Sequence, residues 1–91
     1  MMVKVFANFR EICQAKAVEV PMDSGDRVID ILEALIRMYP ALDEEIFTPE
    51  RTFKPFVHVF INGRNVIHAD GLQTRVTEED QFALFPPVAG G

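Results

Sequence analysis

Side chains capable of chemistry are few and scattered in this 91-residue chain. Cys13 is the only cysteine, which excludes an internal disulfide and a thiolate metal cluster. Its neighbours Ile12 and Gln14 carry no charge that would lower the pKa of its thiol, so we interpret it as a bystander. His58 and His68 are too far apart for a local ligand pair, and no acidic pair brackets them at metal spacing. We therefore predict no metal site and interpret both histidines as structural or surface residues.

The sequence ends in FPPVAGG, where the backbone itself offers chemistry. Pro86 and Pro87 have no N–H for a sheet ladder, so strand pairing must stop there and the chain leaves extended. Gly90 and Gly91 carry no Cβ, so a narrow channel can close around them. At about 3.3 Å per residue, residues 86–91 would span roughly 20 Å. That length is sufficient to enter another protein's active site.

The free α-carboxylate of Gly91 is the reactive group that this tail would present. Its pKa, near ~3.5, makes it an anion at neutral pH and a poor electrophile. It becomes reactive only when another enzyme converts it, for example into an acyl-adenylate with a good leaving group. The alternative is a slack tail without a function, because many chain ends are loose.

The elements that must position this tail follow from the pattern of apolar residues. Val3–Phe9 and Lys16–Val20 alternate and are predicted to be strands, joined as a hairpin by the polar turn REICQA. Arg27–Tyr39 has apolar residues at helical spacing. Asp26 is its predicted N-cap and Pro40 its stop. Val28, Ile31, Leu32, Leu35 and Met38 are the predicted buried face of this helix.

The second half of the chain is predicted to add three more strands. Ala41–Pro55 is a mixed polar connection with one short helical turn. Phe56–Asn62 alternates as a strand and leads into a tight turn at Asn62–Arg64, where Asn and Gly tolerate positive φ. Asn65–Ala69 is interpreted as a short returning strand, and Gln81–Phe85 as the last strand.

This order of elements predicts an α+β fold, in which a mixed sheet carries one main helix across it and the last strand lies beside the first. We expect Leu32 and Leu35 of the helix to meet Val5, Val59 and Leu84 of the strands.

Composition and charge restrict the class of protein. A hydrophobic fraction of 48% with 25% charged residues is typical of a soluble globular domain, predicted here as residues 1–85 with residues 86–91 as an extended tail. The net charge of −5 argues against nucleic-acid binding. No signal-peptide pattern and no run of about 20 apolar residues occurs, which predicts a cytoplasmic protein without membrane contact.

Three phenylalanines are predicted to form a partner-binding surface. Phe6, Phe60 and Phe85 each lie on the strand face opposite the predicted core residues. If the first, third and last strands are neighbours, the rings cluster on the sheet face away from the helix, and exposed aromatic patches often mark interfaces. The alternative is that these rings are scattered, or covered by the connection at residues 41–55.

FPPVAGG after EEDQFALF, together with VKVFANFRE and FINGRNV, resembles the ubiquitin-like sulfur-carrier family. The most similar branch is the small subunit of molybdopterin synthase (MoaD), including archaeal relatives that act as small protein modifiers. The resemblance covers essentially the whole chain and implies a β-grasp fold. It implies that a ubiquitin-activating-like enzyme adenylates the terminal glycine with ATP, and that the glycine then carries sulfur as a thiocarboxylate. The tail would enter a larger subunit that builds the dithiolene of the molybdenum or tungsten pterin cofactor.

By this motif match, Gly91 is the residue that carries the sulfur. The implied tail-threading residues are Pro86, Pro87, Val88, Ala89 and Gly90. The resemblance implies no independent active site and no permanently bound cofactor, and it gives no role to residues 41–55. Two other functions stay open: a protein modifier conjugated through Gly91 to lysines of target proteins, and a plain β-grasp binding domain with an inert tail.

Overall fold

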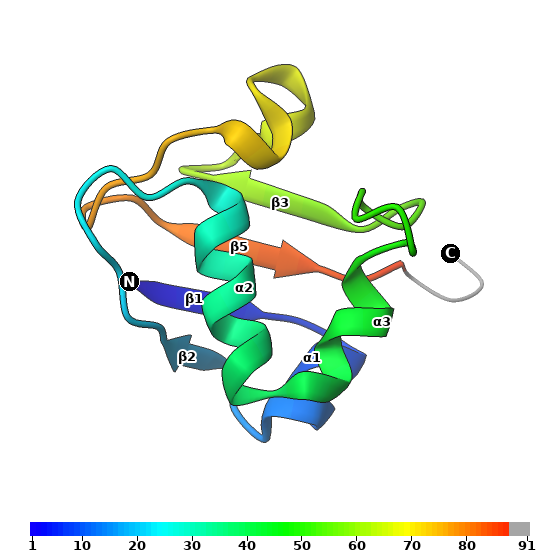
Figure 1. The fold of residues 1–91 in the computed structure, drawn as a ribbon. Helices are drawn as coiled ribbons and strands as arrows, with labels where there is room; N and C mark the ends of the chain where they lie inside the picture. The colour runs from blue at the N-terminus through cyan, green and yellow to red at the C-terminus, as the bar shows by residue number, and fades with distance from the viewer. Residues whose placement is uncertain (88–91) are drawn as a thin grey trace.

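The alternating apolar segments build a five-stranded mixed sheet with helices packed across it (Figure 1). The computed structural model describes residues 1–87. The spatial order of the strands is β2-β1-β5-β3-β4, with β1 and β5 parallel and the other neighbouring pairs antiparallel. The last strand therefore lies beside the first, as the sequence predicts. The strands are β1 (Met2–Val5), β2 (Ala17–Glu19), β3 (His58–Ile61), β4 (Arg64–Asn65) and β5 (Phe82–Phe85).

Within the described residues, three α-helices accompany the sheet, and Figure 1 shows the longest, α2, crossing one face. Three short 3-10 turns connect the elements, and among residues 1–87 no helix is long and apolar enough to cross a membrane. The helices are α1 (Asn8–Cys13), α2 (Val28–Met38) and α3 (Asp43–Ile46), and the 3-10 turns are Pro40–Leu42, Val66–His68 and Gly71–Gln73.

Helix α2 packs on the sheet through the side chains that its spacing predicts. Leu32 and Leu35 are fully buried, as are Val5, Val59 and Leu84 from the three central strands. Burying a Leu or Val side chain stabilises the fold by about 1.5–3 kcal/mol, so this layer is the main source of stability. The expected contact between helix and sheet is confirmed.

The ends of α2 differ in detail from the prediction. Arg27, not Asp26, is the N-cap residue, and its N–H donates to the Asp30 carboxylate at 2.8 Å. The Asp26 carboxylate instead accepts from the N–H of Asp23, which stabilises the preceding turn. Met38, a predicted residue of the buried face, is 45% exposed and lines the hollow beside α2.

The predicted first strand is too long, because the chain turns into a helix after Val5. Ala7 adopts a positive φ of 51°, and Asn8–Cys13 then forms α1 where a strand end and a polar turn were expected. Phe9 and Cys13, four residues apart, are both buried on one face of α1. Burial of this pair outweighs the local alternation, which is itself compatible with a strand.

The turn between β3 and β4 follows the sequence prediction. Asn62 and Gly63 both adopt positive φ, 53° and 82°, as a two-residue hairpin turn of type I′ requires. The predicted returning strand is only partly correct, since β4 ends at Asn65. The Asn65 side chain accepts from the N–H of Ile67 at 3.1 Å, and this bond starts a 3-10 turn in place of a longer strand.

The connection at residues 41–55 contains the expected short helical turn, α3, and has its own apolar contacts. Leu42, Ile46 and Phe47 are buried, and Phe47 forms an isolated β-bridge with Phe53. Arg51 lies 4.5 Å from the Phe47 ring centroid. Figure 1 shows α3 on the same side of the sheet as α2, so this helix packs on the core rather than over the opposite face.

Candidate functional site

Strand β5 carries the last aromatic ring to the end of the sheet. Phe85 pairs with His58 of β3, and the preceding Leu84 pairs with Val5 of β1. The start of β5 is fixed by Asn62, whose Oδ1 accepts from the Gln81 N–H at 2.8 Å. A strand held on both sides cannot slip in register, so the position of the Phe85 ring is determined by the sheet.

The chain after β5 is described for two residues. Pro86 is buried and Pro87 is exposed. The ladder therefore stops at Phe85, as two prolines require, while the chain stays packed against the domain for one further residue. The predicted threading residues Val88, Ala89 and Gly90 and the predicted reactive Gly91 lie outside the described residues.

The three predicted partner-binding rings lie together. The Phe6 and Phe85 ring centroids are 4.2 Å apart with planes inclined by 7°, so these rings stack. Phe60 meets Phe85 edge-on, at 5.3 Å and 80°. Each pair contributes about 0.5–1.5 kcal/mol beyond its buried area. Because all three rings remain half-exposed, this aromatic cluster (Phe6, Phe60 and Phe85) is an apolar surface beside the exit of the tail.

Arg10 and His58 border the aromatic cluster, and the sequence analysis did not connect either residue with it. The Arg10 guanidinium carbon lies 4.8 Å from the Phe6 ring centroid, and Arg10 Nε donates to the Val5 carbonyl oxygen at 2.7 Å. His58 lies edge-on to Phe60, with ring centroids 6.5 Å apart. Phe6 and Arg10 are four residues apart, and such residues would not be neighbours in the strand predicted over Val3–Phe9. They lie together because the chain turns into α1 after Ala7.

The one cysteine and the two histidines lie at buried, partly buried and exposed positions. Cys13 is buried, and burial raises the pKa of its thiol, which keeps it protonated at neutral pH. A ring nitrogen of His58, Nδ1, lies 3.1 Å from Nδ2 of Asn65. The carbonyl of the exposed His68 accepts from Arg64. Within residues 1–87, no group of His, Cys, Asp and Glu side chains is arranged to hold a metal ion.

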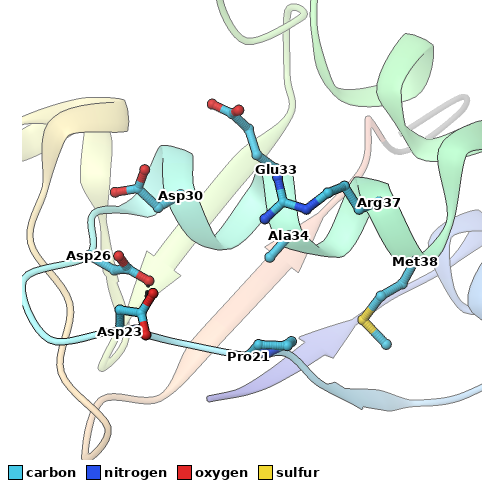
Figure 2. Close-up of a pocket in the computed structure, with 8 residues that line it drawn as sticks. All are labelled: Pro21, Asp23, Asp26, Asp30, Glu33, Ala34, Arg37 and Met38. Atoms are coloured by element: carbon cyan, nitrogen blue, oxygen red, sulfur yellow. Dashed lines mark hydrogen bonds between the residues drawn. The ribbon is translucent and has the colours of Figure 1, made fainter.

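A separate hollow of about 410 Å³ lies between α2 and the loop that precedes it (Figure 2). Four carboxylates line it, from Asp23, Asp26, Asp30 and Glu33. Asp26 and Asp30 already accept backbone N–H groups of the turn and the helix start. We therefore interpret this hollow as an acidic surface that stabilises the start of α2 and has no reactive arrangement.

Comparison with known proteins identifies relatives along the whole chain. The model of the ThiS family matches residues 3–91. Small archaeal modifier protein 3 of Haloferax volcanii is 37% identical over 89 residues, which cover 98% of this chain and 96% of that protein. The sulfur carrier protein CysO of Mycobacterium tuberculosis is 30% identical over 70 residues, 75% of each chain.

The fold is also similar to that of a relative whose structure has been solved. The crystal structure of SAMP1 from Haloferax volcanii matches with a TM-score of 0.88 and 33% identity, covering 100% of this chain and 98% of that one. The β-grasp fold implied by the terminal motif is thereby confirmed. The chain belongs to the ThiS family of ubiquitin-like proteins, which includes sulfur carriers and small protein modifiers.

Proposed function

We propose that this protein is a sulfur carrier that is activated at the carboxylate of Gly91. An adenylating enzyme would join this carboxylate to AMP from ATP, releasing pyrophosphate. Sulfide would then attack the acyl carbon and displace AMP, leaving a thiocarboxylate on Gly91. The carrier supplies the carboxylate, and the partner enzyme supplies the ATP site and the catalytic groups.

The observation that carries this proposal is the aromatic cluster at the end of β5 in a chain of this family. Ordering a flexible tail costs about 1–2 kcal/mol per residue, so a tail alone would bind weakly. Burying each ring of the cluster in a partner contributes up to about 1.5–3 kcal/mol. A partner that covers Phe6, Phe60 and Phe85 would sit directly beside Pro86, where residues 87–91 could enter its active site.

We further propose that the sulfur is used to build the dithiolene of a molybdenum or tungsten pterin cofactor. The large subunit of a molybdopterin synthase would be the acceptor, and a ubiquitin-activating-like enzyme the activator. The support is the resemblance of FPPVAGG and its companion motifs to the small subunit of that synthase. The sulfur carrier CysO among the relatives supports the thiocarboxylate chemistry but not this particular acceptor.

The second candidate function is that of a protein modifier joined through Gly91 to target lysines. It is favoured by the similarity to a small archaeal modifier protein. Both functions begin with the same adenylate and differ in the nucleophile that follows, which is sulfur in one case and a lysine amine in the other.

The intact mass of the protein purified from its own cells separates these functions. A gain equal to one sulfur replacing one oxygen at the carboxyl end identifies the carrier. Denaturant-resistant conjugates of higher mass, carrying Gly91 on lysine, identify the modifier. A variant lacking Gly90 and Gly91 that retains full function in the cell would contradict both and leave a binding domain with an inert tail.

A further inference from the structure

Phe56 combines a left-handed backbone conformation with a highly exposed side chain. It follows Pro55 in a tight turn that is closed by the Val57 N–H, which donates to the Lys54 carbonyl oxygen at 3.1 Å, and a positive φ at this position suits glycine better than a bulky residue. The φ of Phe56 is 67°, in the left-handed region that is a genuine outlier for a bulky residue. Its side chain is 74% exposed, so this strain is not offset by burial in the core. Strained residues that contribute little to the core cluster at functional positions, which makes Phe56 a candidate for an interaction with another molecule.

Phe56 belongs to an apolar groove of about 250 Å³ along the outer side of β3. Ile67, which also lines this groove, is 68% exposed. We call this surface the edge groove; its main apolar residues are Phe53, Pro55, Phe56, Val66 and Ile67. His58 also lines it and touches the aromatic cluster through Phe60, so the two surfaces adjoin but use different side chains.

The one Lys, Arg, Asp or Glu side chain that lines the edge groove among residues 1–87 is positively charged, in contrast to the acidic chain as a whole. Lys54 lines the groove, and the guanidinium of Arg64 is bound to the carbonyl of His68, next to Ile67. Of residues 1–87, no Asp or Glu lines it, although the chain has a net charge of −5. Complementary charge determines which partners approach such a surface, and here it favours carboxylates.

We propose that the edge groove is a docking site for a protein segment that carries an aliphatic side chain flanked by aspartate or glutamate. The aliphatic side chain would pack between Phe56 and Ile67, and the carboxylates would lie against Lys54 and Arg64. The edge groove lies beside the aromatic cluster, because His58 of the groove pairs with Phe85 of β5, but its apolar side chains are different ones.

Two synthetic peptides test the proposal, one with the sequence Glu-Asp-Leu-Ile-Glu-Asp and one in which lysine replaces all four acids. Titration of isotope-labelled protein should shift the amide resonances of Lys54, Phe56 and Ile67 with the acidic peptide. We expect it to bind at least tenfold more tightly than the basic peptide, and more weakly as salt is added. Because the whole chain is acidic, non-specific attraction would give the reverse order. Equal or reversed affinities, or no shift at these three residues, would overturn the proposal.

Variants separate docking from a structural role of Phe56. Glycine adopts positive φ without strain, so Phe56→Gly should melt at or above the wild-type temperature and yet bind the acidic peptide at least fivefold more weakly. Lys54→Glu should weaken binding similarly, whereas Met38→Ala, which removes an exposed apolar side chain on α2, should leave it unchanged. A lower melting temperature for Phe56→Gly would mean that the ring is structural. Self-association through these residues, seen by sedimentation, would mean that a second copy is the occupant.

Discussion

The ring of Phe85 lies at the junction between the sheet and the tail, with Phe6 stacked on it and Phe60 against its edge. The position of this ring is fixed by strand β5, which pairs with β1 on one side and with β3 on the other. A rigid, half-exposed aromatic side chain binds a partner at little cost in side-chain entropy, which is why such rings are frequent among interface hot spots.

Phe85→Ala should therefore weaken binding of the partner that covers the aromatic cluster by at least about 1–2 kcal/mol. Calorimetric titration with the partner proposed above, the large subunit of a molybdopterin synthase, is the measurement. The variant should remain folded, because Phe85 lies at the surface of the core. Met38→Ala, on α2, is the matched control and should bind as the wild type does. Unchanged affinity of a folded Phe85→Ala protein would place the docking surface elsewhere.

Arg10 supports the aromatic cluster through its contact with the Phe6 ring and its hydrogen bond to the Val5 carbonyl oxygen. Arg10→Met keeps much of the side-chain length but removes both interactions. We expect the free energy of unfolding to fall by about 1–2 kcal/mol, since hydrogen bonds to charged groups contribute about 1.5–3 kcal/mol and this one is partly exposed. Arg10→Lys should recover less than half, because an ammonium cannot reproduce the planar contact. Urea melts that coincide with those of the wild type would show that this position is not structural.

At the scale of the element, α2 is the helix that holds the sheet in shape. Its buried face consists of residues that are three and four positions apart, and the acidic residues of its first turns remain in solvent. The sheet positions the aromatic cluster, so the cluster depends on α2 without touching it.

Leu35→Ala should lower the free energy of unfolding by about 2–5 kcal/mol, because the side chain is fully buried and its removal leaves a cavity. Denaturant melts measure this loss. In the same helix, Met38→Ala should change stability by less than about 0.5 kcal/mol, since that side chain is largely exposed. Similar losses for the two variants would contradict the orientation of α2.

At the scale of the whole molecule, charge is unevenly distributed. Carboxylates line the hollow at the start of α2, while Arg10 contacts the aromatic cluster and Lys54 lines the edge groove. A partner with carboxylates around an apolar surface would thus be steered to the side from which the tail leaves, and this attraction would weaken at high salt.

Removal of Gly91 should abolish ATP-dependent activation and leave the thermal stability almost unchanged, because the buried layer between α2 and the sheet is formed by residues 5–84 and a glycine has no side chain to pack. The measurement is the formation of the acyl-adenylate with the activating enzyme, which is monitored by the release of pyrophosphate. The melting temperatures of the truncated and full-length proteins serve as the control. A truncated chain that still forms an adenylate would exclude Gly91 as the reacting residue.

The sequence alone determined those elements whose local pattern agrees with their tertiary environment. Helix α2 combines helical spacing with a proline stop, the Asn62–Gly63 turn needs residues that accept positive φ, and the Pro86–Pro87 pair cannot continue a ladder. Alternation in β3 and β5 also placed Phe60 and Phe85 on the face away from the core. In each case one local physical preference is strong enough to decide the outcome.

Only the tertiary structure decided where local preferences compete. VKVFANF alternates as a strand, yet the chain leaves the sheet after Val5, because a turn of helix buries both Phe9 and Cys13. Helix α1 brings Arg10 into contact with the Phe6 ring, and the alternating sequence pattern does not predict this contact. The edge groove also depends on the tertiary structure. Phe56 precedes β3 and Ile67 lies in the 3-10 turn after β4, and both line the groove only in the folded protein. Long-range burial outweighs local pattern at these positions, and sequence spacing does not record it.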